Sequence, residues 1–582
     1  MKRMLCLSAS LLALSIGSAT AAGAAEVGQS TQTSRINHSI TGTTDGENAN
    51  GAGGRRDNGF QSDAFRSSKG IIHAAQNNGS NNAMSTTDAI AVETVGSAAQ
   101  TSSITAKVQT NTYLAGAGAD RDNALANAAT GAAGIVTLQQ NNGDGNSVAA
   151  GNALFVKQSG TSEQTIRIGQ EVGGDYSDDL HNDGFSSSAR DNVLGQGSLD
   201  GATGLLTVQQ NNGDMNALAI QNALTVNDKA GALDQTLNTS NTVSSNWMWD
   251  ETTAARTNSL SGALTKAQGI ITVQQNNGDG NAASIATAIT ADMDKEHASS
   301  AQTVRSSNTV VDTRSDDYTG GTSTGVRSNS LTGAFSGVQG IVTVDQNNGS
   351  NNATSISTAI AAGLKKDEKA GKDGKASQSV IMTGVVDGSM SIEASDGSKA
   401  SERRNVTDGA FNAADGAPAR GILTLRQNNG DNNSMSTATA VAVGDMEQQT
   451  VRGSATVTGA IAEDGPSVSR NNTLSNSFNK AEGIVSVQQN NGSNNVMGSA
   501  VAIGVAQGAS TPLAQTAALD ATVAASESYS GAGGAGIVLS NRASNVFNGA
   551  QGILTLQQNN GNNNAIQSVI TVSASGSFTG GR

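Results

Sequence analysis

One motif occurs eight times in this chain, and the repetition limits the folds that the chain can adopt. The motif is a glycine, two aliphatic residues, usually a threonine, a further aliphatic residue, and then typically Gln-Gln-Asn-Asn-Gly, two variable residues and an asparagine. The copies begin at Gly70, Gly134, Gly204, Gly269, Gly340, Gly421, Gly483 and Gly552, which are 62 to 81 residues apart. Such internal repetition is typical of folds that stack one structural unit many times. We therefore expect eight modules rather than several independent domains.

Each motif copy is predicted to form a strand, a turn and a second strand. Ile, Val, Leu and Thr favour the extended conformation, and Asn-Gly is expected to supply the positive backbone angles of a tight hairpin or a solenoid corner. After the turn of the third copy, Leu218 and Ile220 alternate with Ala217 and Ala219, so one face is bulky and the other small. The fold class is thus all-β, either a repeat β-solenoid or stacked cross-β hairpins. If a rung takes roughly 23 residues, each module holds about three rungs and the stack is a rod of about 110 Å.

The amide side chains of the motif fall at matching positions in successive copies. Stacking would place like amides above like amides, each donating a hydrogen bond to one neighbour and accepting one from the next. The predicted ladder residues are Gln139, Gln140, Asn146, Gln209, Gln210, Asn216, Gln274, Gln275, Asn281, Gln346, Gln427, Gln488, Gln489, Gln557 and Gln558. The predicted turn residues are Asn142, Gly143, Asn212, Gly213, Asn277, Gly278, Asn348, Gly349, Asn429, Gly430, Asn491, Gly492, Asn560 and Gly561.

Two weaker motifs accompany most copies. About 30 residues downstream lies Gln-Thr or Gln-Ser, at Gln100, Gln164, Gln235, Gln302, Gln378, Gln449 and Gln515. Upstream lies an arginine two residues before an asparagine, as at Arg190, Arg256 and Arg327. The repeating unit is therefore larger than the motif, and the stretches of variable length between the motifs are expected to be loops.

The composition excludes several classes of protein. Aromatic residues make up 3% and hydrophobic residues 36% of the chain, which is too little for several conventional cores. Charged residues are only 14% and there are 3 prolines, whereas disordered chains are usually rich in both. The net charge of −14 argues against nucleic acid as a partner. Backbone pairing and amide ladders remain as the source of order.

The first residues have the features of a secretory signal peptide. Lys2 and Arg3 precede an apolar run, and small residues follow near residue 25. We expect a signal peptide at 1–25, a lead segment at 26–69, the repeat region at 70–572 and a polar tail at 573–582. The mature protein would be secreted, not membrane-spanning, and would lack Cys6, the chain's only cysteine.

The sequence shows no pattern that would support catalysis, so we expect no enzyme, no cofactor and no metal centre. The four histidines lack the spacing of metal ligands, and there is no nucleophile elbow or phosphate loop. The turns leave one alternative open, because Asp144, Asp214, Asp279 and Asp431 follow Asn-Asn-Gly as in an oxygen-rich ion loop. In the other four copies Ser or Asn stands there, which favours a turn residue over a weak calcium site.

Segments such as Val273 to Ala283, with Gln274-Gln275-Asn276-Asn277-Gly278 at their centre, resemble the repeats of bacterial functional amyloids, namely the curlin repeat and the Asn/Gln/Ala repeats of Pseudomonas-type amyloid fibres. The resemblance implies a subunit that a Gram-negative bacterium exports through an outer-membrane channel, with a periplasmic chaperone. It also implies self-association outside the cell into cross-β fibres for biofilm and adhesion, and it assigns the ladder to the Gln and Asn positions given above. Curlin repeats are shorter and nearly contiguous, which is a departure from the family pattern.

Two functions follow from these observations. The first is a secreted subunit that assembles into extracellular amyloid-like fibres, such as a fimbrium, for surface adhesion and biofilm matrix. The alternative is a monomeric β-solenoid adhesin that binds a surface or glycan through its inserts. Unprotected end rungs favour the fibre, whereas an adhesin needs capping segments at both ends.

Overall fold

The structure is a computed structural model that describes residues 30–575, apart from short connecting segments. These segments are 42–43, 47–54, 61–63, 94–97, 115–119, 158–161, 180–188, 228–232, 251–254, 293–299, 320–324, 365–376, 396–400, 445–447, 466, 507–513 and 531–536. The expected signal peptide and residues 576–582 of the tail lie outside the described part. No helix in the described part is long and apolar enough to cross a membrane.

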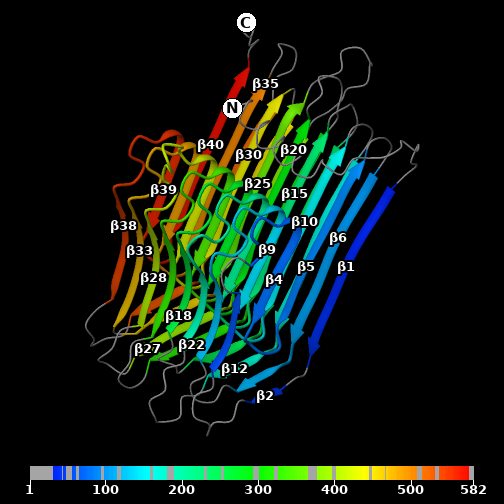
Figure 1. Cartoon of the computed structure of the whole chain (residues 1–582). Helices are drawn as coiled ribbons and strands as arrows, with labels where there is room; N and C mark the ends of the chain where they lie inside the picture. Colours follow the sequence, from blue (N-terminus) through cyan, green and yellow to red (C-terminus); the bar gives the residue numbers. More distant parts are fainter. Residues whose placement is uncertain are drawn as a thin grey trace, which may run out of the picture.

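The described residues form five parallel sheets of eight strands each (Figure 1). Sheet A contains β1 (Ser30–Thr41), β6 (Ala98–Gln109), β11 (Ser162–Gly173), β16 (Leu233–Ser244), β21 (Ser300–Val311), β26 (Ser377–Asp387), β31 (Gln448–Thr458) and β36 (Ala514–Ala524). Sheet B contains β2 (Thr44–Gly46), β7 (Thr112–Leu114), β12 (Tyr176–Asp179), β17 (Trp247–Asp250), β22 (Arg314–Thr319), β27 (Met390–Ser395), β32 (Ile461–Asp464) and β37 (Glu527–Ser530). Sheet C contains β3 (Arg55–Phe60), β8 (Asp120–Leu125), β13 (Ala189–Leu194), β18 (Ala255–Ser261), β23 (Val326–Thr332), β28 (Ser401–Asp408), β33 (Val468–Ser475) and β38 (Val538–Ser544).

The two remaining sheets are formed by the motif itself. Sheet D contains the strands before the turn, β4 (Lys69–Asn77), β9 (Ala133–Asn141), β14 (Thr203–Asn211), β19 (Gln268–Asn276), β24 (Gln339–Asn347), β29 (Arg420–Asn428), β34 (Glu482–Asn490) and β39 (Gln551–Asn559). Sheet E contains the strands after it, β5 (Ala83–Glu93), β10 (Ser147–Lys157), β15 (Ala217–Asn227), β20 (Ala282–Asp292), β25 (Ala353–Leu364), β30 (Ser434–Gly444), β35 (Val496–Ala506) and β40 (Ala565–Ser575). The expected all-β repeat solenoid is thus confirmed.

Each module contributes one strand to every sheet, so five consecutive strands form one layer and the molecule has eight layers. The colour change from blue to red in Figure 1 follows these layers from β1–β5, the N-terminal layer, to β36–β40, the C-terminal layer. The prediction of three rungs per module is therefore wrong. It fails because the stretches between motif copies, expected to be loops, form the strands of sheets A, B and C. At about 4.8 Å per layer the stack is only about 38 Å tall.

The strands on either side of each turn do not pair with each other. β9 and β10 flank Asn142 and Gly143, yet β9 belongs to sheet D and β10 to sheet E, and each pairs in parallel with the next module. The turn is thus a solenoid corner and not a hairpin. Residues 26–69, expected as a lead segment, contain β1, β2 and β3, which begin sheets A, B and C.

Sheet E lies between sheets A and D, and sheet D packs on its other face against sheet C (Figure 1). The small face of sheet E packs against sheet A, where Ala223 and Leu237 belong to one buried cluster. The bulky face packs against sheet D, where Leu224 joins Leu205. The alternation of large and small residues in the sequence therefore sets the order of the layers across the solenoid.

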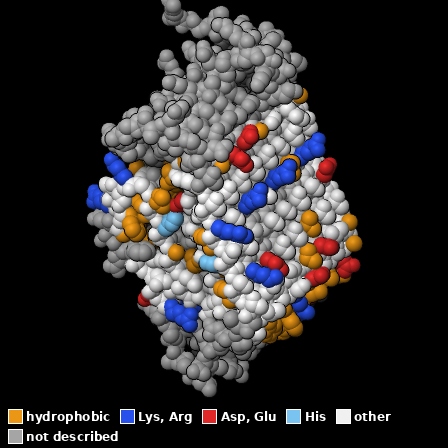
Figure 2. All heavy atoms as spheres, turned by 90° about the vertical axis from the view of Figure 1, so that its right-hand side faces the viewer, with side chains coloured by type: hydrophobic (Ala, Val, Ile, Leu, Met, Phe, Trp, Pro, Cys, Tyr) orange, Lys and Arg blue, Asp and Glu red, His pale blue; other side chains and the backbone are white. Residues whose placement is uncertain are grey.

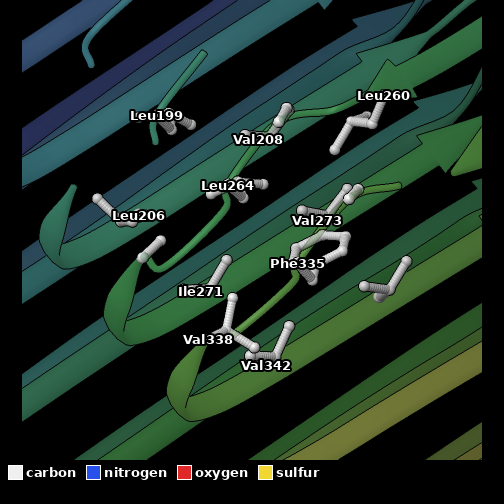
Figure 3. Close-up of a cluster of buried hydrophobic side chains, with 14 of the residues drawn as sticks. Leu199, Leu206, Val208, Leu260, Leu264, Ile271, Val273, Phe335, Val338 and Val342 are labelled. Atoms are coloured by element: carbon white, nitrogen blue, oxygen red, sulfur yellow. The ribbon is translucent and has the colours of Figure 1, made fainter. Parts of the chain in front are cut away.

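The largest apolar cluster lies between sheets C and D and the corner that joins them. Figure 3 shows Leu264 and Phe335 at this corner beside Ile271 and Val342 of sheet D. In later layers the corner position is Phe411 and then Phe478, whose rings stack with centroids 4.8 Å (Phe335–Phe411) and 4.4 Å (Phe411–Phe478) apart. Sequence analysis did not single out this column of corner residues.

Candidate functional site: side-chain ladders and end layers

The second glutamine of the motif forms an unbroken ladder through all eight layers. Each amide nitrogen donates to the amide oxygen of the layer before it, as from Gln140 to Gln76 and from Gln210 to Gln140, both at 2.8 Å. The further donors, in order, are Gln275, Gln346, Gln427, Gln489 and Gln558. All members from Gln140 to Gln489 are buried. A buried amide left without a partner is costly, so the ladder ties each layer to its neighbours.

The asparagines of the motif form further ladders. The first asparagine donates toward the N-terminal layer, from Asn141 to Asn77 and onward to the pair Asn559 and Asn490. The second donates in the opposite direction, for example from Asn142 to Asn212. The side-chain oxygen of the last motif asparagine accepts from backbone of the next layer, as Asn146 Oδ1 does from the amide of Asn216 and Asn216 Oδ1 from that of Asn281.

The first glutamine forms only partial ladders. Gln139 donates to Gln209 at 2.8 Å and Gln209 to Gln274 at 3.2 Å, while Gln488 donates to Gln557 at 2.9 Å. The first layer has Ala75 at this position, and layers five and six have Asp345 and Arg426. The Gln-Thr motif of sheet A, by contrast, forms a complete ladder from Gln32 to Gln515, whose pairs are Gln100–Gln32, Gln164–Gln100, Gln235–Gln164, Gln302–Gln235, Gln378–Gln302, Gln449–Gln378 and Gln515–Gln449.

The turn glycines lie at the corner, but they do not supply its positive backbone angles. Those occur two residues later, at Asn81, Gly145, Met215, Gly280, Asn351, Asn432, Asn494 and Asn563. The expectation for Asn-Gly is therefore wrong on this point. The glycine is required instead by the neighbouring layer, because a Cβ on Gly143 would lie 1.9 Å from the carbonyl oxygen of Gly213, and the same contact recurs at Gly213, Gly278, Gly349, Gly430 and Gly492.

A column of buried arginines runs beside the turns. Arg190 donates to Asp214 at 2.8 Å and Arg256 to Asp279 at 2.6 Å, and Arg256 also lies 3.6 Å from Asp214 of the preceding layer. Burial raises the pKa of Asp279, but Arg256 and Arg327 more than offset this effect, and the pKa falls to about 2. The sequence carries a signal for this pairing, since each turn aspartate has an arginine of the upstream motif 23 to 28 residues before it.

Where the turn has serine, a different acid replaces the aspartate. Arg327 contacts Ser350 and also Asp317 of sheet B, at 2.6 Å. Arg470 contacts Ser493 together with Asp464 of sheet B, at 2.5 Å. The charges of Arg327 and Arg470 are thus balanced although their own turns lack the aspartate.

This pairing bears on the calcium alternative. The four turn aspartates already contact guanidinium groups, through Arg121 for Asp144, Arg190 for Asp214, Arg256 for Asp279 and Arg403 for Asp431. Glu393, Asp431 and Asp464 are the one group of metal-type ligands found in the described part. Arg470 lies within 3.0 Å of all three, so a cation already occupies the centre of this group.

The two end layers are exposed and differ in chemistry. In the C-terminal layer, large apolar side chains are open to solvent, with Val538 54%, Val569 46% and Leu556 39% exposed. The N-terminal layer exposes charged residues, among them Arg35, Lys69 and Arg66. Figure 2 looks onto the side of the molecule where β1 lies, and Lys and Arg side chains form a row there on a mostly neutral polar surface. In both layers one edge of each sheet has no further strand beside it among the described residues.

Comparison with known proteins gives one match. Residues 172–363, from the end of β11 to β25, match the model of the functional amyloid protein FapB/FapC family. No curated protein and no solved structure matches the chain. The matched region contains the ladders of layers three to five and the corners between them. The resemblance that the repeats indicate is therefore confirmed: over residues 172–363 the chain is similar to the bacterial functional-amyloid subunits of the FapB/FapC family.

Proposed function

We propose that the chain is a secreted structural subunit that self-assembles, outside the cell, into amyloid-like fibres for adhesion and biofilm matrix. Assembly adds the N-terminal layer of one chain to the C-terminal layer of another. After removal of residues 1–25 the chain is exported through an outer-membrane channel with a periplasmic chaperone, as the resemblance implies. Residues 30–575 then act as one repeat domain, with the amides of the motif as its ladder.

The observation that carries this proposal is the continuity of the ladders across the two ends. If the register of sheets A, C and D is extended by one layer, Gln515 meets Gln32 of the next chain, Asn541 meets Asn58, and Gln558 meets Gln76. The ladder of the second motif glutamine ends at Gln558. The side-chain oxygen of Gln558 is the acceptor that the side-chain amide of Gln76 from an incoming chain requires. Open edges of parallel sheets also favour pairing with a further strand.

Growth of purified chain lacking residues 1–25 tests the proposal. Leu556 is exposed in the C-terminal layer but aligns with buried Val487 of the layer before it. We expect Leu556→Lys to fold and to stop elongation, because a second chain would bury the new charge. The matched control is Thr516→Lys, at an outward position of sheet A where Thr450 lies one layer away and Thr33 of the next chain would lie on the other side.

Thioflavin fluorescence and fibre diffraction measure the outcome. The proposal predicts fibres with a reflection near 4.8 Å for the unaltered chain and for the control, and none for Leu556→Lys. A stable folded monomer that never grows would contradict it and would favour the monomeric adhesin. Equal growth of all three chains would exclude the C-terminal layer as the growing end.

A further inference from the structure

One ladder position carries opposite charges in two consecutive layers. The first glutamine of Gln-Gln is Asp345 in layer five and Arg426 in layer six, whereas Gln occupies the position in layers two, three, four, seven and eight. The register of β24 and β29 places Asp345 directly beside Arg426. The two departures from the motif are therefore a matched pair.

The pair is fully bonded and shielded from solvent. Arg426 Nε donates to Asp345 Oδ1 at 2.8 Å, and Arg426 Nη2 donates to Asp345 Oδ2 at 2.6 Å. The remaining guanidinium nitrogen donates to the backbone oxygens of Ser355 and Met435, both at 3.1 Å. The side chain of Asp345 is 2% exposed and that of Arg426 is 0% exposed. Such a two-pronged geometry is the arrangement in which arginine binds a carboxylate best.

The pair interrupts the ladder around it. Gln139 donates to Gln209 and Gln209 to Gln274, but the side-chain nitrogen of Gln274, which faces layer five, has no partner among the described residues. The neighbouring Gln140 ladder passes through the same layers without a break. The chain therefore loses an amide bond at this point and has an ion pair in its place.

Amide and charged side chains differ in how strictly they determine which layers can stack on each other. An amide can stack on any other amide, so the Gln and Asn ladders alone accept any layer on any other. A buried charge accepts only its counter-charge, because Asp345 beside an amide or beside a second Asp345 would be buried without compensation. A single buried polar group can fix the register of a repetitive assembly in this way.

The buried arginine column does not have this selectivity. Its members recur in six successive layers, and most of them contact an acid of their own layer and one of the layer before. A shift of one layer would thus place arginine beside acid again. Asp345 and Arg426 occur once each, so a shift leaves both unmatched.

We propose that Asp345 and Arg426 are a register key, a specificity-determining pair that allows the C-terminal side of layer five to stack only on layer six. Interior layers of one chain then cannot pair out of order with those of another, and contacts between chains are directed to the two end layers. This role rests on the proposed self-assembly, but it also governs the folding of a single chain.

A cysteine reporter tests the key. The chain without residues 1–25 has no cysteine, and Ile381 lies on the outward side of sheet A in layer six, between Arg305 and Arg452. With Ile381→Cys, two chains form a disulfide at this site only if layer six of one stacks on layer six of the other, because the Cα atoms must approach within roughly 7 Å. The chains are refolded together from denaturant under reducing conditions and then oxidised.

The test compares three further changes in the reporter chain. Asp345→Gln with Arg426→Gln restores the amides, and we expect a several-fold increase in disulfide-linked dimers on a non-reducing gel. Asp345→Arg with Arg426→Asp keeps a matched pair and should give as few dimers as the reporter alone. The control is Arg420→Gln with Glu482→Gln, which removes a half-exposed ion pair of the same sheet, and it should also change nothing.

The outcomes separate this proposal from the self-assembly on which it rests. Equal dimer fractions with and without the Asp345–Arg426 pair would overturn the register key, even if every chain forms fibres. An increase confined to the double glutamine variant would support the key, even if no chain forms fibres. If the double glutamine variant does not fold, the variant with Asp345→Arg and Arg426→Asp provides the test. A high fraction of disulfide-linked dimers in that variant would contradict a role based on matched charges.

Discussion

At the scale of single residues, the neighbouring layer decides which side chains are allowed. Gly143 has no positive backbone angle, yet its Cα lies so close to the next layer that a Cβ would sit 1.9 Å from the oxygen of Gly213. Gly169, in β11 of sheet A, has nothing within 4 Å of the same position. The neighbouring layer therefore requires glycine at position 143, whereas it leaves room for a larger residue at position 169.

Alanine substitution separates these reasons. Gly143→Ala should lower the free energy of unfolding by about 2 kcal/mol or more, because layers must move apart at the corner. Gly169→Ala should be neutral or stabilising by about 0.5 kcal/mol, since alanine restricts the unfolded chain. Urea unfolding of both variants measures the difference, and equal losses would contradict the close contact.

Asp175 provides a pH-dependent prediction. It lies in a column with Asn111 and Asn246, and it accepts a hydrogen bond from the backbone amide of Asn111 at 2.7 Å. Burial raises the pKa of Asp175 to about 7, although its bonds with Asn111 oppose the shift. Because the folded-state pKa is raised, ionisation costs no stability below about pH 4, an increasing amount up to pH 7, and the full amount above.

Asp175→Asn removes this cost and continues the asparagine column. We expect the variant to be more stable than the unaltered chain by roughly 2 to 4 kcal/mol at pH 8, and by almost nothing at pH 4. Thermal unfolding across this pH range checks the prediction. A gain that is the same at both pH values would show that Asp175 does not titrate as described.

At the scale of elements, the buried arginine column links sheet C to the turns and to sheet B. Arg327 of β23 contacts Asp317 of β22, Asp279 of the preceding layer and Ser350 of its own turn. Asp317 thus replaces the carboxylate that Ser350 lacks. The acid can come from either of two elements, provided that it reaches the same guanidinium group.

This interchange is testable with a rescue. Asp317→Asn should destabilise the fold by about 2 kcal/mol, because Arg327 loses a charged hydrogen bond. Adding Ser350→Asp places the carboxylate where layers two, three, four and six have it, and should restore much of the loss. Urea unfolding measures both steps, and a second change that leaves the loss intact would refute the interchange.

The elements were only partly predictable from the sequence. The strands around the motif are uniform in composition, so sheets D and E were evident. β12 and β17 have almost no residue in common, and Tyr176 pairs with Trp247 only because their layers are stacked. The regular pairing of the longer strands fixes these short ones in place, and no local pattern reveals that. The glutamine ladders could be predicted from the uniform motif. The asparagine ladders could not, because the first and second motif asparagines form them, whereas Asn146 and Asn216, predicted as ladder residues, accept from backbone amides instead. The arginine column depends on contacts between sheets that no local pattern indicates.

At the scale of the whole molecule, the fold is a stack of eight layers whose two end layers differ in chemistry. Interior layers are buried on both sides, whereas the C-terminal layer exposes Leu554 and Val572 and the N-terminal layer exposes Ile71 among charged residues. Since all five sheets are parallel and in register, one chain can extend another only head to tail without breaking the ladders. The expected fibre is therefore polar.

The height of one chain in the fibre tests this account most directly. One layer per module and head-to-tail stacking predict one chain for every 38 Å or so of fibre, from eight layers of about 4.8 Å. Mass per unit length, measured by scanning transmission electron microscopy of unstained single filaments, gives this value once the filament is known to hold one column of chains. One chain per 38 Å would support the account. One chain per roughly 110 Å, as three rungs per module would give, would contradict it.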